Sequence, residues 1–136
     1  MTPKTKTLAL TLAMAAAATM AHANATNPAV KERMNAMKII GASTKVLGGM
    51  AGGKMDFDAD KAAMALADMK TASMSVPALF EAEETDPESE AKAEIWTNWE
   101  DFVAKSDALT AAANAMDASS LEGIQAGMGA IGGSCK

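Results

Sequence analysis

Apolar residues recur at steps of three and four through most of the chain after residue 27, which is the spacing of one face of an α-helix. Alanine is abundant and no window alternates apolar and polar residues, so we expect no strands. The spacing predicts four helices, over residues 28–50, 59–73, 87–116 and from 119 onward. We therefore predict an all-α fold, an antiparallel four-helix bundle with a long loop between helices two and three.

The third segment has the clearest pattern. Its stripe alternates steps of four and three residues through Ile95, Trp99, Phe102, Ser106, Leu109, Ala113 and Met116. Such a stripe is typical of the seam between antiparallel helices that cross at a shallow angle. Ser119 and Glu122 have the spacing of a capping box, which predicts the start of the fourth helix. Only Asp117-Ala118 separates the last two helices, so we expect a tight hairpin.

The second helix is expected to end before Ser75-Val76-Pro77, because proline lacks the N–H that continues the helical ladder. Leu79 and Phe80 would then lie in a loop as an apolar plug. An acidic run from Glu81 to Glu90 follows. We interpret it as a solvated loop whose last acids are favourable at a helix N-terminus.

Residues 1–23 have the organisation of a secretory leader. Lys4 and Lys6 precede an apolar run over residues 8–20, which is too short to span a bilayer comfortably. Ala21-His22-Ala23 follows, with small residues at the positions that a signal peptidase reads. We expect cleavage after Ala23, or alternatively after Ala25, and a periplasmic protein with no membrane span. The mature domain would be residues 24–136, without His22, the sole histidine.

The predicted mature chain is acidic. Removal of the leader takes away two of twelve basic residues and no acid, which leaves ten against seventeen and a net charge of −7. This charge disfavours nucleic acid and anionic lipid and suits a basic partner, such as a small redox protein. No Ser-His-Asp set, phosphate-binding loop or zinc-ligand spacing occurs, so we do not expect an enzyme.

The last sixteen residues contain the sole cysteine. Leu121, Ile124, Met128 and Ile131 form a helical stripe, and its next step falls on Cys135, which is therefore expected to face the core. An exported protein with one unpaired thiol needs an explanation, and covalent attachment to a buried cofactor is one. The nearby glycines either let a bulky flat group lie against the backbone or mark a frayed helix end. They are Gly127, Gly129, Gly132 and Gly133.

Several short motifs occur in a fixed order along the predicted mature chain. They are Arg33 with Met37, Phe57-Asp58, Pro77-Ala78-Leu79-Phe80, the run from Glu94 to Trp99 with Phe102, and Gly132-Gly133-Ser134-Cys135-Lys136. This ordered set resembles the cytochrome c-prime family and its low-spin relatives, the class II c-type cytochromes. In that family the last motif continues as C-x-x-C-H, which attaches haem c through two thioethers and supplies the proximal histidine.

Only the first cysteine of that motif, Cys135, is present before the sequence ends. An incomplete record of a longer protein and a genuine truncation with lost cofactor binding both account for this. The first is favoured, because the remainder of the bundle pattern is intact.

The resemblance implies roles for six residues, Cys135, Met37, Arg33, Met34, Glu90 and Trp96. Cys135 would form a thioether to haem, and Met37 would be a distal iron ligand rather than ordinary core filler. Arg33 would lie near a haem propionate, the alternative being a solvent-facing charge. Met34 and Glu90 would contact haem, and Trp96 or Trp99 would pack against the ring edge.

A methionine ligand at the Met37 position implies electron transfer by a low-spin haem, which is our first hypothesis. A five-coordinate haem that senses or scavenges NO or CO is the alternative within the family. Outside it, Met34 and Met37 could bind Cu(I) through their thioethers, or the bundle could be a non-catalytic interaction module. The resemblance also implies a homodimer formed through the first two helices as a further possibility.

Overall fold

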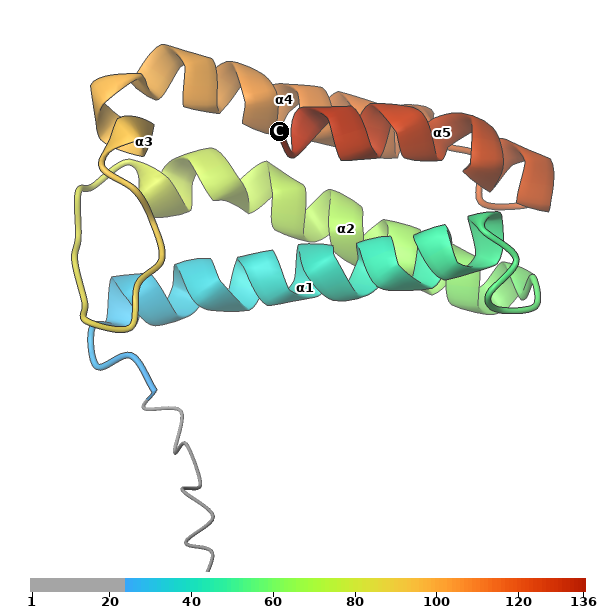
Figure 1. Cartoon of the computed structure of the whole chain (residues 1–136), viewed down its shortest axis with the longest axis horizontal. Helices are drawn as coiled ribbons and strands as arrows, with labels where there is room; N and C mark the ends of the chain where they lie inside the picture. Colours follow the sequence, from blue (N-terminus) through green and yellow to red (C-terminus); the bar gives the residue numbers. More distant parts are fainter. Residues whose placement is uncertain (1–23) are drawn as a thin grey trace, which may run out of the picture.

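The computed structural model describes residues 24–136. The predicted leader, residues 1–23, lies outside the described residues. The described part contains helices and no strand. The helices are α1 (Pro28–Ala51), α2 (Ala59–Phe80), α3 (Glu94–Thr97), α4 (Trp99–Ala115) and α5 (Leu121–Ser134). Helices α1, α2, α4 and α5 form an antiparallel bundle, and α3 is a short turn beside the start of α4 (Figure 1). The predicted fold class is confirmed.

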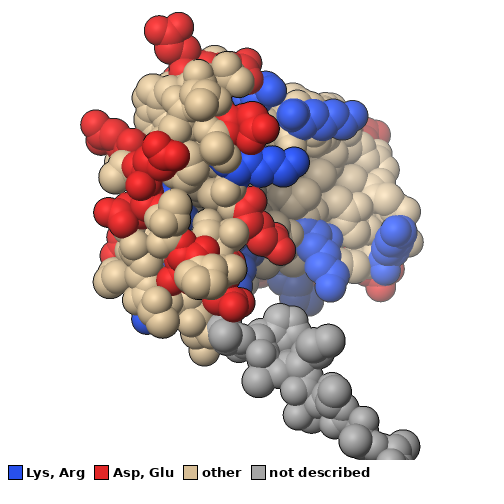
Figure 2. All heavy atoms as spheres, turned by 60° about the vertical axis from the view of Figure 1, so that its left-hand side comes forward, with Lys and Arg blue, Asp and Glu red and all other residues tan. Residues whose placement is uncertain are grey.

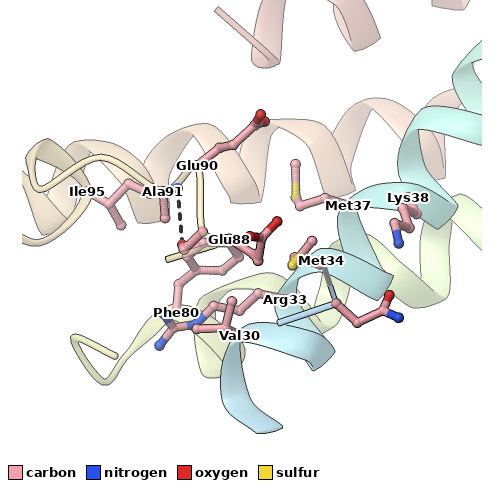
Figure 3. A pocket seen from close by; sticks show the side chains of 12 residues that line it. Val30, Arg33, Met34, Met37, Lys38, Phe80, Glu88, Glu90, Ala91 and Ile95 are labelled. Carbon is pink, nitrogen blue, oxygen red and sulfur yellow. Dashed lines mark hydrogen bonds between the residues drawn. The ribbon is translucent and has the colours of Figure 1, made fainter. Parts of the chain in front are cut away.

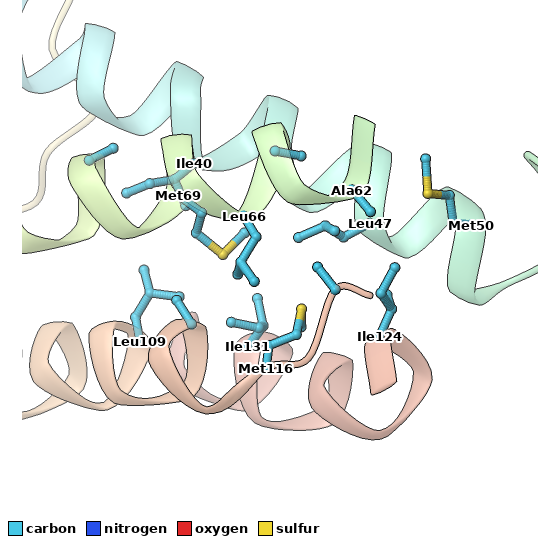
Figure 4. Close-up of a cluster of buried hydrophobic side chains, with 14 of the residues drawn as sticks. Ile40, Leu47, Met50, Ala62, Leu66, Met69, Leu109, Met116, Ile124 and Ile131 are labelled. Atoms are coloured by element: carbon cyan, nitrogen blue, oxygen red, sulfur yellow. The ribbon is translucent and has the colours of Figure 1, made fainter. Parts of the chain in front are cut away.

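The core lies where the inner stripes of the four long helices meet. Helix α1 packs against α2 and α5, and α4 packs against the same two helices. Large side chains with less than 2% of their surface exposed fill the centre, namely Leu47, Met50, Met69, Ile124 and Ile131. Figure 4 shows most of them meeting between the two helix pairs. Each such side chain contributes about 1.5–3 kcal/mol through removal of its apolar surface from water.

The predicted end of the second helix is wrong, because α2 continues through Pro77 to Phe80. A proline inside a helix costs about 3 kcal/mol. Val76 and Phe80 are only 5% and 6% exposed, and each burial returns about 1.5–3 kcal/mol. The packing of the last turn therefore offsets the cost of Pro77, which the local sequence pattern does not reveal.

The predicted third helix is shorter than expected and interrupted. Residues 87–93 are not helical, and Asn98, with φ −122° and ψ 47°, separates α3 from α4. In the loop, side chains bind nearby backbone amides in place of a helical ladder. Asp86 accepts from the amide of Glu88, and Ser89 accepts from that of Ala91. Such local hydrogen bonds compete with helix formation. The inward stripe of α4 is otherwise confirmed, with Ser106, Leu109 and Ala113 buried.

The N-cap of α5 is Ser120, one residue after the predicted Ser119. The Ser120 hydroxyl accepts from the amide of Gly123 at 3.0 Å. Ser119 instead donates its amide and its hydroxyl to Asp117, which lowers the pKa of that carboxyl. Asp117 therefore keeps Ser119 in the turn, and the expected tight hairpin between α4 and α5 is present.

The glycines of α5 differ in their surroundings. A Cβ on Gly127 would come within 2.8 Å of Met116, so the backbone there approaches a side chain of the protein itself. Gly129, Gly132 and Gly133 have open space beside them. Because α5 stays helical through Ser134, the interpretation of a frayed end is wrong for this stretch.

We predict that Gly123→Ala destabilises the bundle by about 1–3 kcal/mol, as overpacking typically does. A Cβ at Gly123 would overlap the backbone carbonyl oxygen of Asp117, which the tight turn cannot move easily. Urea unfolding followed by circular dichroism measures the change. Gly129→Ala is the matched control, because nothing lies within 4 Å of its Cβ. It should stabilise α5 by about 0.5–1 kcal/mol, and equal stabilities for the two variants would contradict the prediction.

Candidate cofactor site

A cavity of about 650 Å³ lies at the end of the bundle where α1 begins and α2 ends. Its volume is within the range of about 300–1,000 Å³ that is typical of ligand and cofactor pockets. Figure 3 shows most of the side chains that line it. They come from the residues before α1, the first half of α1, the end of α2, the α2–α3 loop and α3, namely Asn24, Val30, Arg33, Met34, Met37, Lys38, Phe80, Glu88, Ser89, Glu90, Ala91 and Ile95.

Helix α5 does not line this cavity. At a rise of 1.5 Å per residue, the 24 residues of α1 extend about 36 Å and the 14 residues of α5 about 21 Å. Helix α5 starts at the opposite end of the bundle, and the described chain ends part of the way along it (Figure 1). The cavity thus lies along the part of α1 that precedes its packing against α5.

Four of the six predicted site residues line this one cavity, Arg33, Met34, Met37 and Glu90. Met34 and Met37 lie one turn apart on α1, with their side chains at the cavity in Figure 3. Met37 is 49% exposed, so it is not core filler. The cavity thus offers two thioethers to a Cu(I) ion. Its lining residues include no cysteine or histidine that could act as a third ligand.

Cys135 is exposed, which corrects the expectation that it faces the core. The stripe does predict the burial of Ile124 and Ile131, which are both 0% exposed. Cys135, however, is the C-cap residue that follows the last helical residue, Ser134. Because Cys135 lies after the last helical residue, helical periodicity no longer directs its side chain toward the core.

Arg33 is buried, with 2% of its surface exposed, so the alternative of a solvent-facing charge is wrong. Its Nε–H donates to the carbonyl oxygen of Leu79 at 2.6 Å. Its two Nη groups donate to the carbonyl oxygens of Glu84, at 3.0 Å, and of Ala82. The guanidinium therefore caps the end of α2 and holds the start of the α2–α3 loop.

Aromatic rings enclose the same guanidinium. Its carbon lies 5.1 Å from the ring centre of Phe80 and 5.4 Å from that of Trp96, within the range of cation–π attraction. Trp96 does not line the cavity, and its indole N–H donates to the carbonyl oxygen of Phe80 at 2.8 Å. Trp99 stacks on Phe102, which contacts Phe80. The two tryptophans thus support the cavity wall from behind.

No carboxylate among residues 24–136 forms an ion pair with Arg33. Its hydrogen-bond partners within this range are backbone carbonyls and its other neighbours include aromatic faces. A buried charge without a counter-ion is costly unless something balances it. Because Arg33 lines the cavity, the positive charge favours an occupant with an anionic group.

Sequence reasoning missed much of the cavity wall. It assigned no site role to Phe80, Ile95, Val30, Lys38 or Glu88, all of which line the cavity. A local signal existed for two of them, since Val30 and Lys38 lie four residues either side of Met34 and so share its face of α1. Nothing local indicated that the α2–α3 loop would close the other side.

Asp86 fastens that loop to the residues before α1. One carboxylate oxygen accepts from the amide of Thr26 at 2.8 Å, from its hydroxyl at 3.0 Å and from the amide of Asn27 at 2.9 Å. The other oxygen accepts from the amide of Glu88. These hydrogen bonds, led by the one from Asn27, lower the pKa of Asp86 to about 2.

We expect the loop to open in acid. The pKa of Asp86 is lowered from 3.8 to about 2 in the fold, so its contribution is present above pH 3.8 and is lost as the pH falls through about 2. Proton NMR of the Thr26 and Asn27 amides during an acid titration measures this. Asp86→Asn should remove the transition, whereas Asp107→Asn, on the exposed side of α4, should preserve it. Persistence of the transition in Asp86→Asn would contradict this assignment.

Two features, a cluster of metal-binding side chains and a membrane-spanning helix, do not occur in the described part of the chain. Within residues 24–136, no three histidine, cysteine, aspartate or glutamate side chains gather into a metal-binding group. Over the same residues, no helix combines the length and the apolar character needed to cross a membrane.

Fold and cavity together define a four-helix-bundle protein with a cofactor-sized pocket at one end. The family model described as Cytochrome C' matches residues 28–136, so the chain belongs to the cytochrome c' family of haem-binding cytochromes. Membership implies a covalently bound haem c. The sequence contains one cysteine, Cys135.

Solved structures of the family have the same fold. Cytochrome c' from Rubrivivax gelatinosus is 30% identical with a TM-score of 0.68, and the match covers 79% of this chain and 88% of that one. The protein from Rhodobacter spheriodes is 28% identical with a TM-score of 0.71 and the same coverage. A ferrous arginine-to-alanine variant from Alcaligenes xylosoxidans with bound NO is 26% identical, with a TM-score of 0.64 and coverage of 79% and 87%. The comparison with curated proteins gave no match.

Proposed function

We propose that the chain is a periplasmic haem protein that transfers electrons through the haem iron and catalyses no reaction of its own. The observation that carries this proposal is the cavity, which brings the thioether of Met37 and the buried charge of Arg33 together. A porphyrin needs an apolar slot, an iron ligand and a balance for its propionates. Among the lining residues, Phe80 would supply apolar contact, Met37 an iron ligand and Arg33 a positive charge for a propionate.

Each cavity residue would have a distinct role in holding a haem. A bound haem supplies the redox-active iron. Arg33 has five N–H donors and uses three on carbonyls, so two remain for a propionate oxygen. Met34 and Phe80 supply apolar contact, and Glu90 lies at the cavity on the loop side. A thioether at Met37 stabilises ferrous iron and so raises the reduction potential.

Attachment of haem would depend on Cys135, the sole cysteine of the sequence. Cys135 is exposed, so a thioether to haem would require its side chain to turn toward the cavity. The described residues contain no histidine to serve as proximal ligand. Sequencing of the coding DNA around Cys135 is therefore the first test of whether the family's C-x-x-C-H motif is present.

Expression in a strain with the c-type maturation machinery tests the proposal directly. We expect red protein whose Soret band stays with the polypeptide after acid–acetone extraction. Cys135→Ala should release at least part of the colour into the acetone, whereas Met64→Ala, an exposed methionine on α2, should not. Colourless protein from this expression would overturn the haem assignment.

Binding of NO or CO is the second candidate function. Two observations favour it, the solved NO complex of a relative from Alcaligenes xylosoxidans and the 49% exposure of Met37. An exposed side chain would be able to give up its place as a ligand of a bound haem iron. Gas titration of the ferrous protein separates the two functions. A methionine-ligated iron should bind CO slowly and weakly, whereas a five-coordinate iron should bind it readily.

A basic redox protein is the partner that we propose. Figure 2 shows acidic side chains gathered over one side of the bundle end that carries the α2–α3 loop. The exposed acids between the end of α2 and the first turn of α4 are Glu81, Glu83, Glu84, Glu90, Glu94, Glu100 and Asp101. Such a surface attracts a basic partner electrostatically, and salt shortens the distance over which this attraction acts. Electron-transfer rates with a basic partner should therefore fall as ionic strength rises.

The homodimer through the first two helices remains a proposal. Helices α1 and α2 pack together, and a shallow groove between them is lined by Ala36, Ile39, Ala72 and Leu79, among others. Sedimentation velocity over a range of concentrations tests it. A monomer at all concentrations would exclude the dimer.

A further inference from the structure

We propose that residues 81–91, here called the strap, form a movable wall of the cavity, and that Arg33 is the positioning residue that keeps this wall closed. This inference rests on the hydrogen bonds of the strap and not on the identity of the occupant. It assigns Arg33 a task that is separate from any pairing with a propionate.

The strap forms one side of the cavity and is not itself helical. Its inner residues Glu88, Ser89, Glu90 and Ala91 line the cavity opposite α1. Among them only Ala91 packs against the hydrophobic core. A segment with so little apolar burial opens at a lower free-energy cost than the helices around it.

Polar contacts to α1 and to the residues just before it hold the strap. Arg33 binds the carbonyls of Ala82 and Glu84 in the strap and that of Leu79 in α2. At the second anchor, Asp86 binds the amides of Thr26 and Asn27, as described above. The side-chain amide of Asn27 also donates to the carboxylate of Glu84 at 2.8 Å.

The two anchors differ in their chemistry. Arg33 is buried, and its fork of charged donors is rigid and matched to three carbonyls at once. Asp86 is partly exposed and pairs with backbone amides. Loss of either anchor should free the strap while the helical core stays packed, because neither lies among the apolar side chains that hold α1, α2, α4 and α5 together. The strap thus has the attachments of a gate.

Hydrogen exchange of residues 24–136 without added haem tests this proposal, so its failure leaves the haem assignment untouched. In Arg33→Gln we expect strap amides to exchange about tenfold faster or more, while amides of α4 and α5 keep most of their protection. The indole N–H of Trp96, which is bonded to Phe80, should also exchange faster. Lys38→Gln is the control, because Lys38 lines the same cavity but has no hydrogen bond or ion pair within residues 24–136.

A thiol placed on the strap measures opening directly. Ala91→Cys in a Cys135→Ser background puts the sole thiol on the inner side of the wall. Its alkylation should accelerate about tenfold on addition of Arg33→Gln, in proportion to the open population. Addition of Lys38→Gln should leave the rate unchanged.

Asp86→Asn keeps the proposal testable if Arg33→Gln fails to fold. It should speed strap exchange several-fold with little change in the midpoint of global unfolding, because Asp86 lies outside the core. Unchanged strap exchange in both variants would overturn the proposal. So would a rise in Arg33→Gln that is equal in the strap and in α4, since that pattern reports global loosening.

Discussion

Under the proposed ligation of haem iron by Met37, its replacement by alanine should convert the spectrum of the haem-loaded protein from low-spin to high-spin. Met37 lines the cavity beside Arg33, and it is an exposed large hydrophobic side chain, 49% accessible, in the first half of α1. A thioether completes a strong-field ligand set, and alanine has no donor atom to replace it. The reduction potential should fall in the same variant, because the thioether favours ferrous iron. Absorption and electron paramagnetic resonance spectra measure the spin state.

Met64→Ala is the matched control for this substitution. Met64 is also exposed, at 63%, but it lies on α2 and does not line the cavity. Its removal should change neither spin state nor potential. A spectrum that stays low-spin in Met37→Ala would exclude this residue as the ligand, and Met34, one turn earlier on the same cavity wall, would be the next residue to test.

The sequence pattern predicted those parts of the fold that depend on periodic burial. The stripe from Ile95 to Met116 faces the core as expected, because an amphipathic helix has one way to remove its apolar side from water. The continuation of α2 past Pro77 was not predictable in this way. It depends on the burial of Val76 and Phe80 against partners far along the chain, and local propensity contains no term for that packing.

The candidate site was predictable where the family resemblance assigned a role to a residue. The pair of Arg33 and Met37 was chosen through the family resemblance, and both line the cavity. The partners of Arg33 were not predictable, because they are carbonyl groups 46 to 51 residues away, and every residue has a carbonyl. The burial of Cys135 was predicted by extending a stripe one step beyond the end of its helix, where helical periodicity no longer fixes the side chain.

Leu47→Ala should lower the free energy of unfolding by about 2–5 kcal/mol, the usual cost of a cavity left by a fully buried leucine. Leu47 is 0% exposed, on the part of α1 beyond the cofactor cavity. Each kcal/mol lowers the melting temperature of a domain of this size by about 4–8 °C. Thermal unfolding followed by circular dichroism measures the loss, and Met64→Ala should stay within about 0.5 kcal/mol of the parent.

The same variant tests whether α1 has two separable halves. Five residues between Val30 and Lys38 line the cofactor cavity, whereas Leu47 and Met50 belong to the hydrophobic core. If the halves are independent, Leu47→Ala should melt earlier and yet keep the haem spectrum and the strap protection of the parent below its transition. A spectrum that changes together with stability would mean that the core positions Met37, and spectral changes in Met37→Ala could then not be assigned to ligand loss alone. Stability and spectrum therefore have to be measured on both variants, because only their independence makes the loss of a ligand distinguishable from the loosening of the helix that holds it.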